Sequence, residues 1–267
     1  MTEQEYNQHE GIRRSDLWKV RESPEKYLWS IGHPEEPTPA LVFGAMVHKL
    51  LLQPGDFTEE YAVSPIFDRR TKTGKEDWIA FCDKNAGKRI VSNDDMMVAA
   101  DMVKAVERHP IARKLLSGEA EKPIFWTDED TGELIKCRLD MLTELDGQPV
   151  VVDYKTANSA ETRVFTNKMF QLGYHMQAYM YTEAVMREMN LTERPPFVFV
   201  VQEKTPPYAV NCILATEPVI MSGMDCFREC IGILHECLES GVFYGYNGKG
   251  NDLNEALLPK WMGGEEE

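Results

Sequence analysis

The fold of this chain is decided by two short stretches, Arg138–Asp140 (RLD) and Val150–Thr156 (VVVDYKT). Three successive valines are β-branched, which predicts a buried strand that delivers an acid and a lysine two residues apart. Side chains alternate between the two faces of a strand. Asp153 and Lys155 are therefore expected on one face, and Tyr154 on the other.

A hairpin is expected to bring a second acid to the same place. Residues 134–139 also have the pattern of a strand, and Asp146-Gly147 is a strong hairpin-turn signal between the two strands. Pairing of these strands brings Asp140 close to Asp153. Two carboxylates and the ammonium group of Lys155 at strand ends are the groups that metal-assisted hydrolysis of a phosphodiester requires.

The sequence around this hairpin predicts an antiparallel meander flanked by helices. Strands are expected at 88–91, 121–127, 134–139, 150–154, 197–201 and 208–215, the last two joined across Pro206-Pro207. Helices are expected at 15–20, from Pro24, at 39–53, at 93–108, in a long region after Ser159 to about 189, and at 217–240. The fold class is α/β (α+β) with a central mixed sheet.

Length and composition place the chain among globular proteins: it has 267 residues, 43% of them hydrophobic, and a net charge of −15. We expect a flexible segment at 1–10, a single domain over 11–262 and an acidic tail at 263–267. The six cysteines show no close paired spacing, and the sequence has neither a signal peptide nor an apolar run of membrane-spanning length. These features predict reduced thiols, a cytoplasmic location and no membrane contact.

The acidic net charge argues against a protein that coats nucleic acid, but not against a nuclease that holds DNA in a local basic channel. The strongest basic run comprises Arg69, Arg70, Lys72 and Lys75, just ahead of an amphipathic helix. These residues could lie in a solvated loop. Because they oppose the charge of the rest of the chain, we favour contact with DNA phosphates.

Two further pairs of residues have helical spacing. Gly44 and His48 lie one turn apart on one side of a helix, as do Gln177 and Tyr181 on another. A glycine permits close approach of another backbone, so that His48 projects from a tightly packed position. A lone histidine is more often structural than a metal ligand.

In chain order the candidate residues are Gly44-x-x-x-His48, Glu121, Asp140, Asp153-x-Lys155 and Gln177-x-x-x-Tyr181. This order resembles the PD-(D/E)xK nuclease superfamily and, within it, the RecB-like exonucleases and the RecE-type (exonuclease VIII) nuclease domains. The resemblance spans about residues 15 to 261. The chain has Leu139-Asp140 where the name-giving motif has Pro-Asp.

The resemblance implies that His48, Asp140, Asp153 and the main-chain carbonyl of Tyr154 bind a divalent metal. Carboxylates and a carbonyl suit Mg²⁺, and an imidazole makes Mn²⁺ competitive. Lys155 would position the attacking water or stabilise charge on the phosphoryl oxygens. The remaining implied roles concern three residues: Gln177 and Tyr181 orient the DNA backbone or support the metal ligands, and Glu121 contacts a second metal or simply ends a strand.

The family also implies processive 5′→3′ digestion of linear double-stranded DNA from its ends. The product is a 3′ single-stranded tail for a RecT-type annealing protein, in phage-type recombination, and the enzyme is a ring-shaped homotetramer. Alternatives are a nuclease of different polarity and a catalytically silent DNA-binding or assembly module. A silent module usually lacks the acid or the lysine, and here Asp140, Asp153 and Lys155 are all present.

Some RecB-like nucleases hold an iron–sulfur cluster with four cysteines. In this chain Cys226, Cys230 and Cys237 fall on one face of the final predicted helix, and the upstream partner cysteine is missing. Buried cysteine behaves as a small hydrophobe, so we expect core packing and no iron–sulfur cluster.

Overall fold

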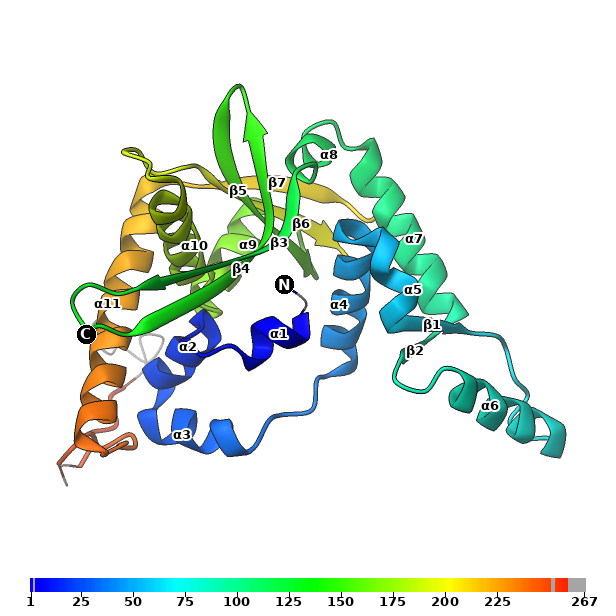
Figure 1. The fold of residues 1–267 in the computed structure, drawn as a ribbon, viewed down its shortest axis with the longest axis horizontal. Helices are drawn as coiled ribbons and strands as arrows, with labels where there is room; N and C mark the ends of the chain where they lie inside the picture. The colour runs from blue at the N-terminus through cyan, green and yellow to red at the C-terminus, as the bar shows by residue number, and fades with distance from the viewer. Residues whose placement is uncertain (2, 251–252, 259–267) are drawn as a thin grey trace.

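A five-stranded mixed sheet in the order β3-β4-β5-β6-β7 forms the centre of the computed structural model, which describes residues 1, 3–250 and 253–258 (Figure 1). Its strands are β3 (Glu119–Thr127), β4 (Leu134–Leu145), β5 (Gln148–Ala157), β6 (Phe197–Glu203) and β7 (Val210–Ala215). Only β5 and β6 pair in parallel within it; the other neighbours are antiparallel. The predicted mixed sheet with an antiparallel meander is confirmed.

The β4–β5 hairpin turns at the expected residues. Leu145 pairs with Gln148, and Asp146 and Gly147 between them have φ angles of 50° and 78°. Positive φ at both central residues is the backbone of a type I′ turn, which explains the Asp-Gly pair. Both strands are longer than expected, because pairing continues toward the turn beyond residues 139 and 150.

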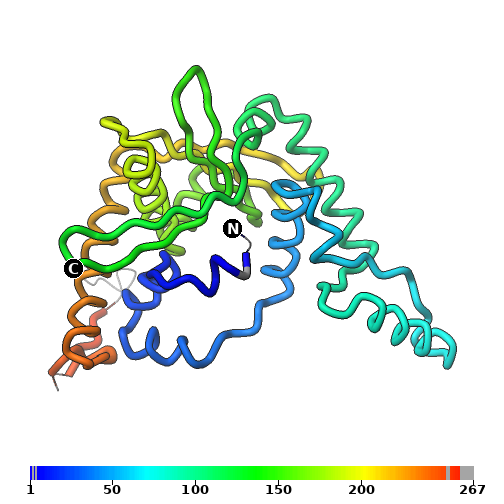
Figure 2. Tube along the Cα trace, in the orientation of Figure 1, coloured from blue at the N-terminus to red at the C-terminus, as the bar shows by residue number. Residues whose placement is uncertain are grey.

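Helices cover both faces of the sheet. They are α1 (Glu3–Gln8), α2 (Arg14–Glu22), α3 (Pro24–Gly32), α4 (Pro39–Leu52), α5 (Phe57–Glu60), α6 (Lys72–Lys84), α7 (Asn93–Arg108), α8 (Ala112–Leu115), α9 (Thr162–Gln171), α10 (Tyr174–Met189) and α11 (Glu217–Ser240), with a 3₁₀ turn at Pro54–Asp56. One core cluster joins the sheet to α2, α9, α10 and α11, and the other joins it to α4, α5, α7 and α8. Figure 2 shows these two groups on opposite sides of the sheet.

Local capping explains several helix starts, and one prediction is corrected. Ser23, Thr38 and Ser92 accept main-chain N–H groups at the starts of α3, α4 and α7, as expected. The region after Ser159 is not one long helix: Glu161 caps α9, and Gly173 then separates α9 from α10. Gly173 has a φ of 70°, and a Cβ there would lie 2.3 Å from the ring of Trp18. This backbone conformation ends α9 and lets α2 approach closely.

Residues 61–92 form an arm that projects from the body of the molecule (Figure 1). It consists of β1 (Tyr61–Ser64), α6 and β2 (Arg89–Ser92), and the two short strands pair in parallel. The predicted strand at 88–91 is thus confirmed.

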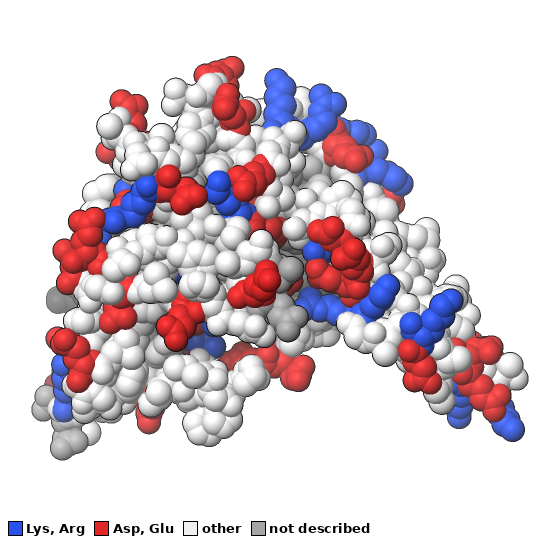
Figure 3. Space-filling model, in the orientation of Figure 1, with Lys and Arg blue, Asp and Glu red and all other residues white. Residues whose placement is uncertain are grey.

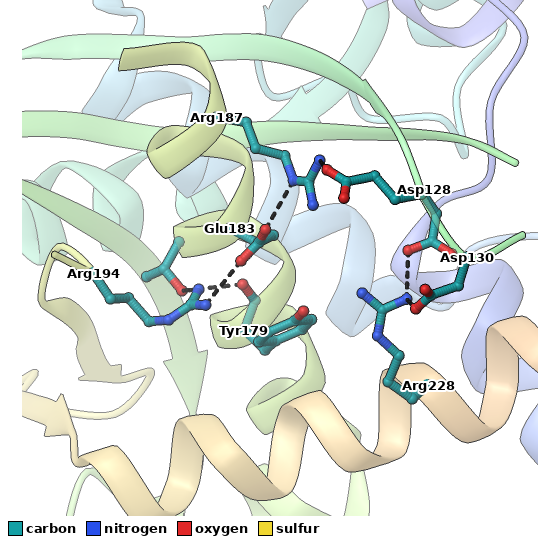
Figure 4. A network of polar contacts seen from close by, with 9 residues as sticks. Asp128, Asp130, Tyr179, Glu183, Arg187, Arg194 and Arg228 are labelled. Carbon is teal, nitrogen blue, oxygen red and sulfur yellow. Dashed lines mark hydrogen bonds and ion pairs between the residues drawn. The ribbon is translucent and has the colours of Figure 1, made fainter. Parts of the chain in front are cut away.

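A network of ion pairs fixes the β3–β4 turn against the helices (Figure 4). Asp128 in the turn is fully buried, and Arg228 of α11 donates to its carboxylate at 2.5 Å. On α10, Glu183 accepts from Arg187 and from Arg194, each at 2.8 Å. The turn between β3 and β4 is therefore anchored to α11, and Arg187 of α10 also pairs with Glu129 of the turn at 2.9 Å.

The N-terminal residues are helical where the sequence predicted a flexible segment. Tyr6 of α1 is buried, and its main-chain carbonyl accepts a hydrogen bond from the buried ammonium group of Lys136 at 3.0 Å. The predicted acidic tail at 263–267 lies outside the described residues, and the domain limits stay a prediction. Within residues 1, 3–250 and 253–258, no helix combines the length and apolar character needed to cross a membrane.

Candidate metal centre and active site

Three side chains from separate elements converge beside the sheet. Nδ1 of His48 lies 3.3 Å from Oε1 of Glu121, and Nε2 of the same ring lies 3.0 Å from Oδ2 of Asp140. One ligand atom from each of the three residues lies within 4.8 Å of the others. We call this the three-residue cluster. An imidazole and two carboxylates at this spacing fit a divalent cation such as Mg²⁺ or Mn²⁺.

A close approach of α4 to the sheet places His48. Gly44 lies one turn before it, and a Cβ on this glycine would lie 3.2 Å from Oγ1 of Thr156. A larger residue at this position would crowd the Thr156 side chain. The predicted close approach of another backbone to Gly44 is therefore wrong among the described residues, because the close neighbour is a side chain of β5.

An irregularity in the sheet places the two acids. Glu121 and Asp140 lie opposite each other, between the pairs Ala120–Met141 and Lys122–Leu139. Glu121 has a φ of 55°, an unusual conformation for a residue with a side chain. Strain of this kind persists where the surroundings hold it and is common at functional sites.

At Asp140, alternate side chains of β4 switch from one face of the sheet to the other. Cys137 and Leu139 belong to the core cluster on the α10 side, whereas Met141 belongs to the cluster on the α4 side. The ladder between β4 and β5 runs only from Met141–Val152 toward the turn, and beyond it Oδ2 of Asp140 accepts the main-chain N–H of Tyr154 at 2.8 Å. The Asp140 side chain thus holds β5 where the regular β4–β5 ladder ends.

Asp153 and Lys155 form a buried ion pair next to the cluster. The Asp153 side chain is fully buried; Nζ of Lys155 lies 2.6 Å from its Oδ2, and Nε2 of Gln177 donates to its Oδ1 at 2.5 Å. Tyr154 points to the opposite face, where its hydroxyl contacts Oε1 of Gln202 at 2.5 Å. The predicted alternation of faces is confirmed.

The structure groups the expected metal ligands differently from the resemblance. Glu121, rather than Asp153, completes the three-residue cluster with His48 and Asp140. The Asp153 carboxylate instead contacts Lys155 and Gln177. The Tyr154 main chain contributes its N–H to Asp140, and its carbonyl as a metal ligand stays a prediction.

Burial and neighbouring charges shift the pKa values in opposite directions. Burial raises the pKa of Asp153 to about 6, only partly offset by Lys155. Burial would also raise the pKa of Asp140, but His48, Lys155 and the N–H of Tyr154 outweigh it and lower this pKa to about 2. Burial opposes a charged His48, yet Asp140 and Glu121 raise the pKa of its imidazole. Without a metal, the carboxylates of the cluster thus favour the protonated form of His48.

Tyr181 lies one turn beyond Gln177 on α10, as the spacing predicted. Both residues line a cavity that also contains Asp140, His48 and Lys155. Burial, together with the charges of the two aspartates, raises the pKa of Tyr181 well above its usual value, so that its hydroxyl stays neutral. Oε1 of Gln177 is buried and has no hydrogen-bond partner among the described residues.

The basic run lies on the arm and not at the cluster. Arg69 stacks over the ring of Trp78 at 3.7 Å, Arg70 pairs with Asp68 at 2.9 Å, and Lys72 and Lys75 lie in the first turn of α6. None of the four lines the cavity of about 390 Å³ that contains His48 and Glu121. Figure 3 shows basic and acidic side chains together on the arm.

Several residues of the site were missed by sequence reasoning. Nε of Arg138 lies 2.6 Å from Oε2 of Glu121. Nζ of Lys155 lies over the ring of Tyr174, 4.8 Å from its centroid. Arg14 contacts the same ring, its guanidinium carbon 5.5 Å from the centroid. The available signals were the position of Arg138, two residues before Asp140, and the place of Arg14 among five basic residues between positions 13 and 26.

Comparison with known proteins agrees with this geometry. A family model described as "PDDEXK-like domain of unknown function (DUF3799)" matches residues 14–255. A crystal structure from Eubacterium rectale, described provisionally as an exonuclease, aligns with a TM-score of 0.65 and 15% identity over 97% of this chain and 96% of that chain. The crystal structure of SSO0001 aligns with a TM-score of only 0.39 and 12% identity, covering 85% of this chain and 81% of that one.

No curated protein matches the sequence. The family match supports a PDDEXK-like nuclease.

Proposed function

Because the chain belongs to the PDDEXK-like family (DUF3799), we propose that it is a divalent-metal-dependent exodeoxyribonuclease acting on the ends of linear double-stranded DNA. The observation that carries the proposal is the three-residue cluster beside the buried Asp153–Lys155 pair. Cation ligands and a fixed ammonium group lie next to each other at the wall of one cavity. This arrangement suits hydrolysis of a phosphodiester.

His48, Glu121 and Asp140 would hold the metal, and we propose Asp153 and the Tyr154 carbonyl as further ligands. When bound, the metal supplies Lewis-acid polarisation of the phosphate and lowers the pKa of a water. Binding requires the neutral imidazole, so His48 releases its proton as the ion enters. The surrounding residues keep these groups oriented: Arg138 holds Glu121, and the N–H of Tyr154 holds Asp140.

Lys155 stabilises the negative charge that grows on the phosphoryl oxygens. Its ammonium group is fixed by Asp153 and lies over the ring of Tyr174, so little reorganisation is needed during reaction. Burial opposes its charged form, but Asp153 and Asp140 outweigh burial and raise the pKa of Lys155. The side chain is therefore a permanent cation. Gln177 orients Asp153 and thereby acts on Lys155 indirectly.

We extend the proposal to processive 5′→3′ digestion that leaves 3′ tails for a RecT-type annealing protein in phage-type recombination. We also propose that the protein forms a ring-shaped homotetramer and is cytoplasmic. The sequence resemblance supports these proposals. The basic run of the arm would contact the duplex. A catalytically silent module is disfavoured, because Asp140, Asp153 and Lys155 are all present and adjacent.

The test uses linear duplex labelled at either the 5′ or the 3′ end, and a covalently closed circle of the same sequence. Each is incubated with Mg²⁺, with Mn²⁺ or with EDTA. We expect the linear duplex to be digested with either metal and to stay intact in EDTA, with release of the 5′ label as the first product. Cleavage of the circle would contradict an exonuclease, and intact linear DNA in both metals would contradict a nuclease.

A further inference from the structure

A groove without carboxylates lies beside the metal centre. It occupies about 500 Å³ between the end of β5, α9 and the start of α10, and Lys155, Thr156 and Tyr174 line both this groove and the cavity of the cluster. The two spaces are therefore neighbours that share three wall residues. We call this the lysine groove, because Lys155, Lys168 and Lys204 line it.

The charge of the lysine groove contrasts with that of the chain. In a protein with a net charge of −15, no aspartate or glutamate among the described residues lines it, whereas Glu3, Glu60 and Glu121 line the neighbouring cavity. Nζ of Lys168 contacts only the amide oxygen of Gln171, at 3.3 Å, and neither Lys168 nor Lys204 has an ion pair within the described part of the chain. Two cations are thus available for an anionic ligand.

The other walls have the character that a nucleobase and sugar require. Val164 and Leu172 line the groove and are 50% and 40% exposed, so that their apolar side chains are available for contact. The amides of Asn158, Asn167 and Gln171 supply hydrogen-bond donors and acceptors among them. Apolar walls with a few polar groups are typical of ligand sites, and single strands bind in grooves that combine cations with flat apolar contacts.

We propose that the lysine groove binds the one or two nucleotides of a single DNA strand that adjoin the scissile phosphate. This inference rests on the proposed function. Lys168 and Lys204 contact successive phosphates, Val164 and Leu172 contact the base, and Lys155 marks the junction with the site of hydrolysis.

The test measures binding of a fluorescent 12-nucleotide single strand by anisotropy in EDTA, where no hydrolysis occurs, over a range of salt concentrations. In Lys168→Ala/Lys204→Ala, loss of two phosphate contacts should weaken binding about 20-fold at ~0.1 M salt and reduce the slope of log Kd against log[salt] by about 1.4. Lys104→Ala/Lys114→Ala, on α7 and α8, removes the same charge away from the groove and should bind as the wild type does.

A second variant tests the apolar wall without removing a lysine. Val164→Asp places a carboxylate at an exposed position of α9, so folding is retained and the strand is repelled. Unchanged binding by both groove variants would overturn the inference and leave the nuclease intact. Failure of the wild type to bind the single strand would also overturn it, and digestion of linear duplex by the same preparation shows independently whether the proposed function stands.

Discussion

Glu121 lies opposite Asp140 across β3 and β4, and the imidazole of His48 contacts both carboxylates, one with each ring nitrogen. Two like charges facing each other across a sheet destabilise it unless a cation lies between them. The raised pKa of His48 favours a protonated imidazole as that cation in the metal-free protein, and the proposed divalent ion would take its place.

Loss of the Glu121 carboxylate should weaken the metal site. Glu121→Gln keeps the size of the side chain and removes one ligand charge, so the Mg²⁺ concentration for half-maximal DNA digestion should rise by about 10-fold or more. Glu119→Gln on the same strand, whose partner is Lys122, is the matched control. Equal Mg²⁺ requirements for both variants would remove Glu121 from the metal site.

Loss of the Lys155 ammonium group should reduce turnover more than substrate binding. Lys155→Ala should lower kcat by about 10²–10³ because a fixed charge near the phosphoryl oxygens is lost. The buried Asp153 then lacks its partner; its pKa, about 6 beside Lys155, should rise further, so that it takes up a proton more readily than an ordinary carboxyl does. Single-turnover kinetics and a thermal melt separate the two effects. Normal turnover in a folded variant would contradict the role of Lys155.

A Cβ atom added to Gly44 should crowd the side chain of Thr156 and thereby displace His48. Gly44→Ala adds a Cβ that would lie 3.2 Å from Oγ1 of Thr156, so the gain of helix propensity is offset and metal affinity falls. Gly232→Ala in α11 adds a Cβ with nothing within 4 Å and should stabilise the fold by up to about 1 kcal/mol. Melting temperatures and Mn²⁺ titrations of both variants test this. A Gly44→Ala protein with normal Mn²⁺ affinity would show that the close approach does not position His48.

The metal-free protein should lose stability as the pH rises above about 6.5, the usual pKa of histidine. The folded pKa of His48 is raised, so its contribution is fully present below the unfolded pKa and is lost as the pH rises through the folded one. The slope reaches at most about 1.4 kcal/mol per pH unit for one group. Denaturant unfolding in EDTA measures it, and His48→Gln should remove this component. An identical pH dependence in wild type and variant would show that His48 carries no such proton.

The arm should contribute to duplex binding through its basic run. Lys75→Ala removes one cation and should lower the slope of log Kd against log[salt] for a duplex by about 0.9. Lys84→Ala, at the other end of α6, is the matched control and should leave the slope unchanged. A slope that is the same for Lys75→Ala and wild type would show that the run is a solvated surface of the arm.

The sequence alone determined most of the sheet and part of the site. The valine run with Asp153 and Lys155, the Asp146-Gly147 turn and the capping residues act over a few positions, so local physics sufficed to predict the meander and the helix starts. The sequence pattern did not show that Gly173 divides a helical region, because a glycine within a helical pattern is often tolerated.

Only the tertiary structure decided which residues meet. The change of facing in β4 at Asp140 and the positive φ of Glu121 depend on how three strands and α4 pack, and together they direct Glu121 toward His48. Gln177 likewise contacts Asp153 because α10 lies on that face of the sheet. Spacing along a chain fixes which side chains share a face, whereas packing between distant elements fixes which ligand atoms come within bonding distance of one ion.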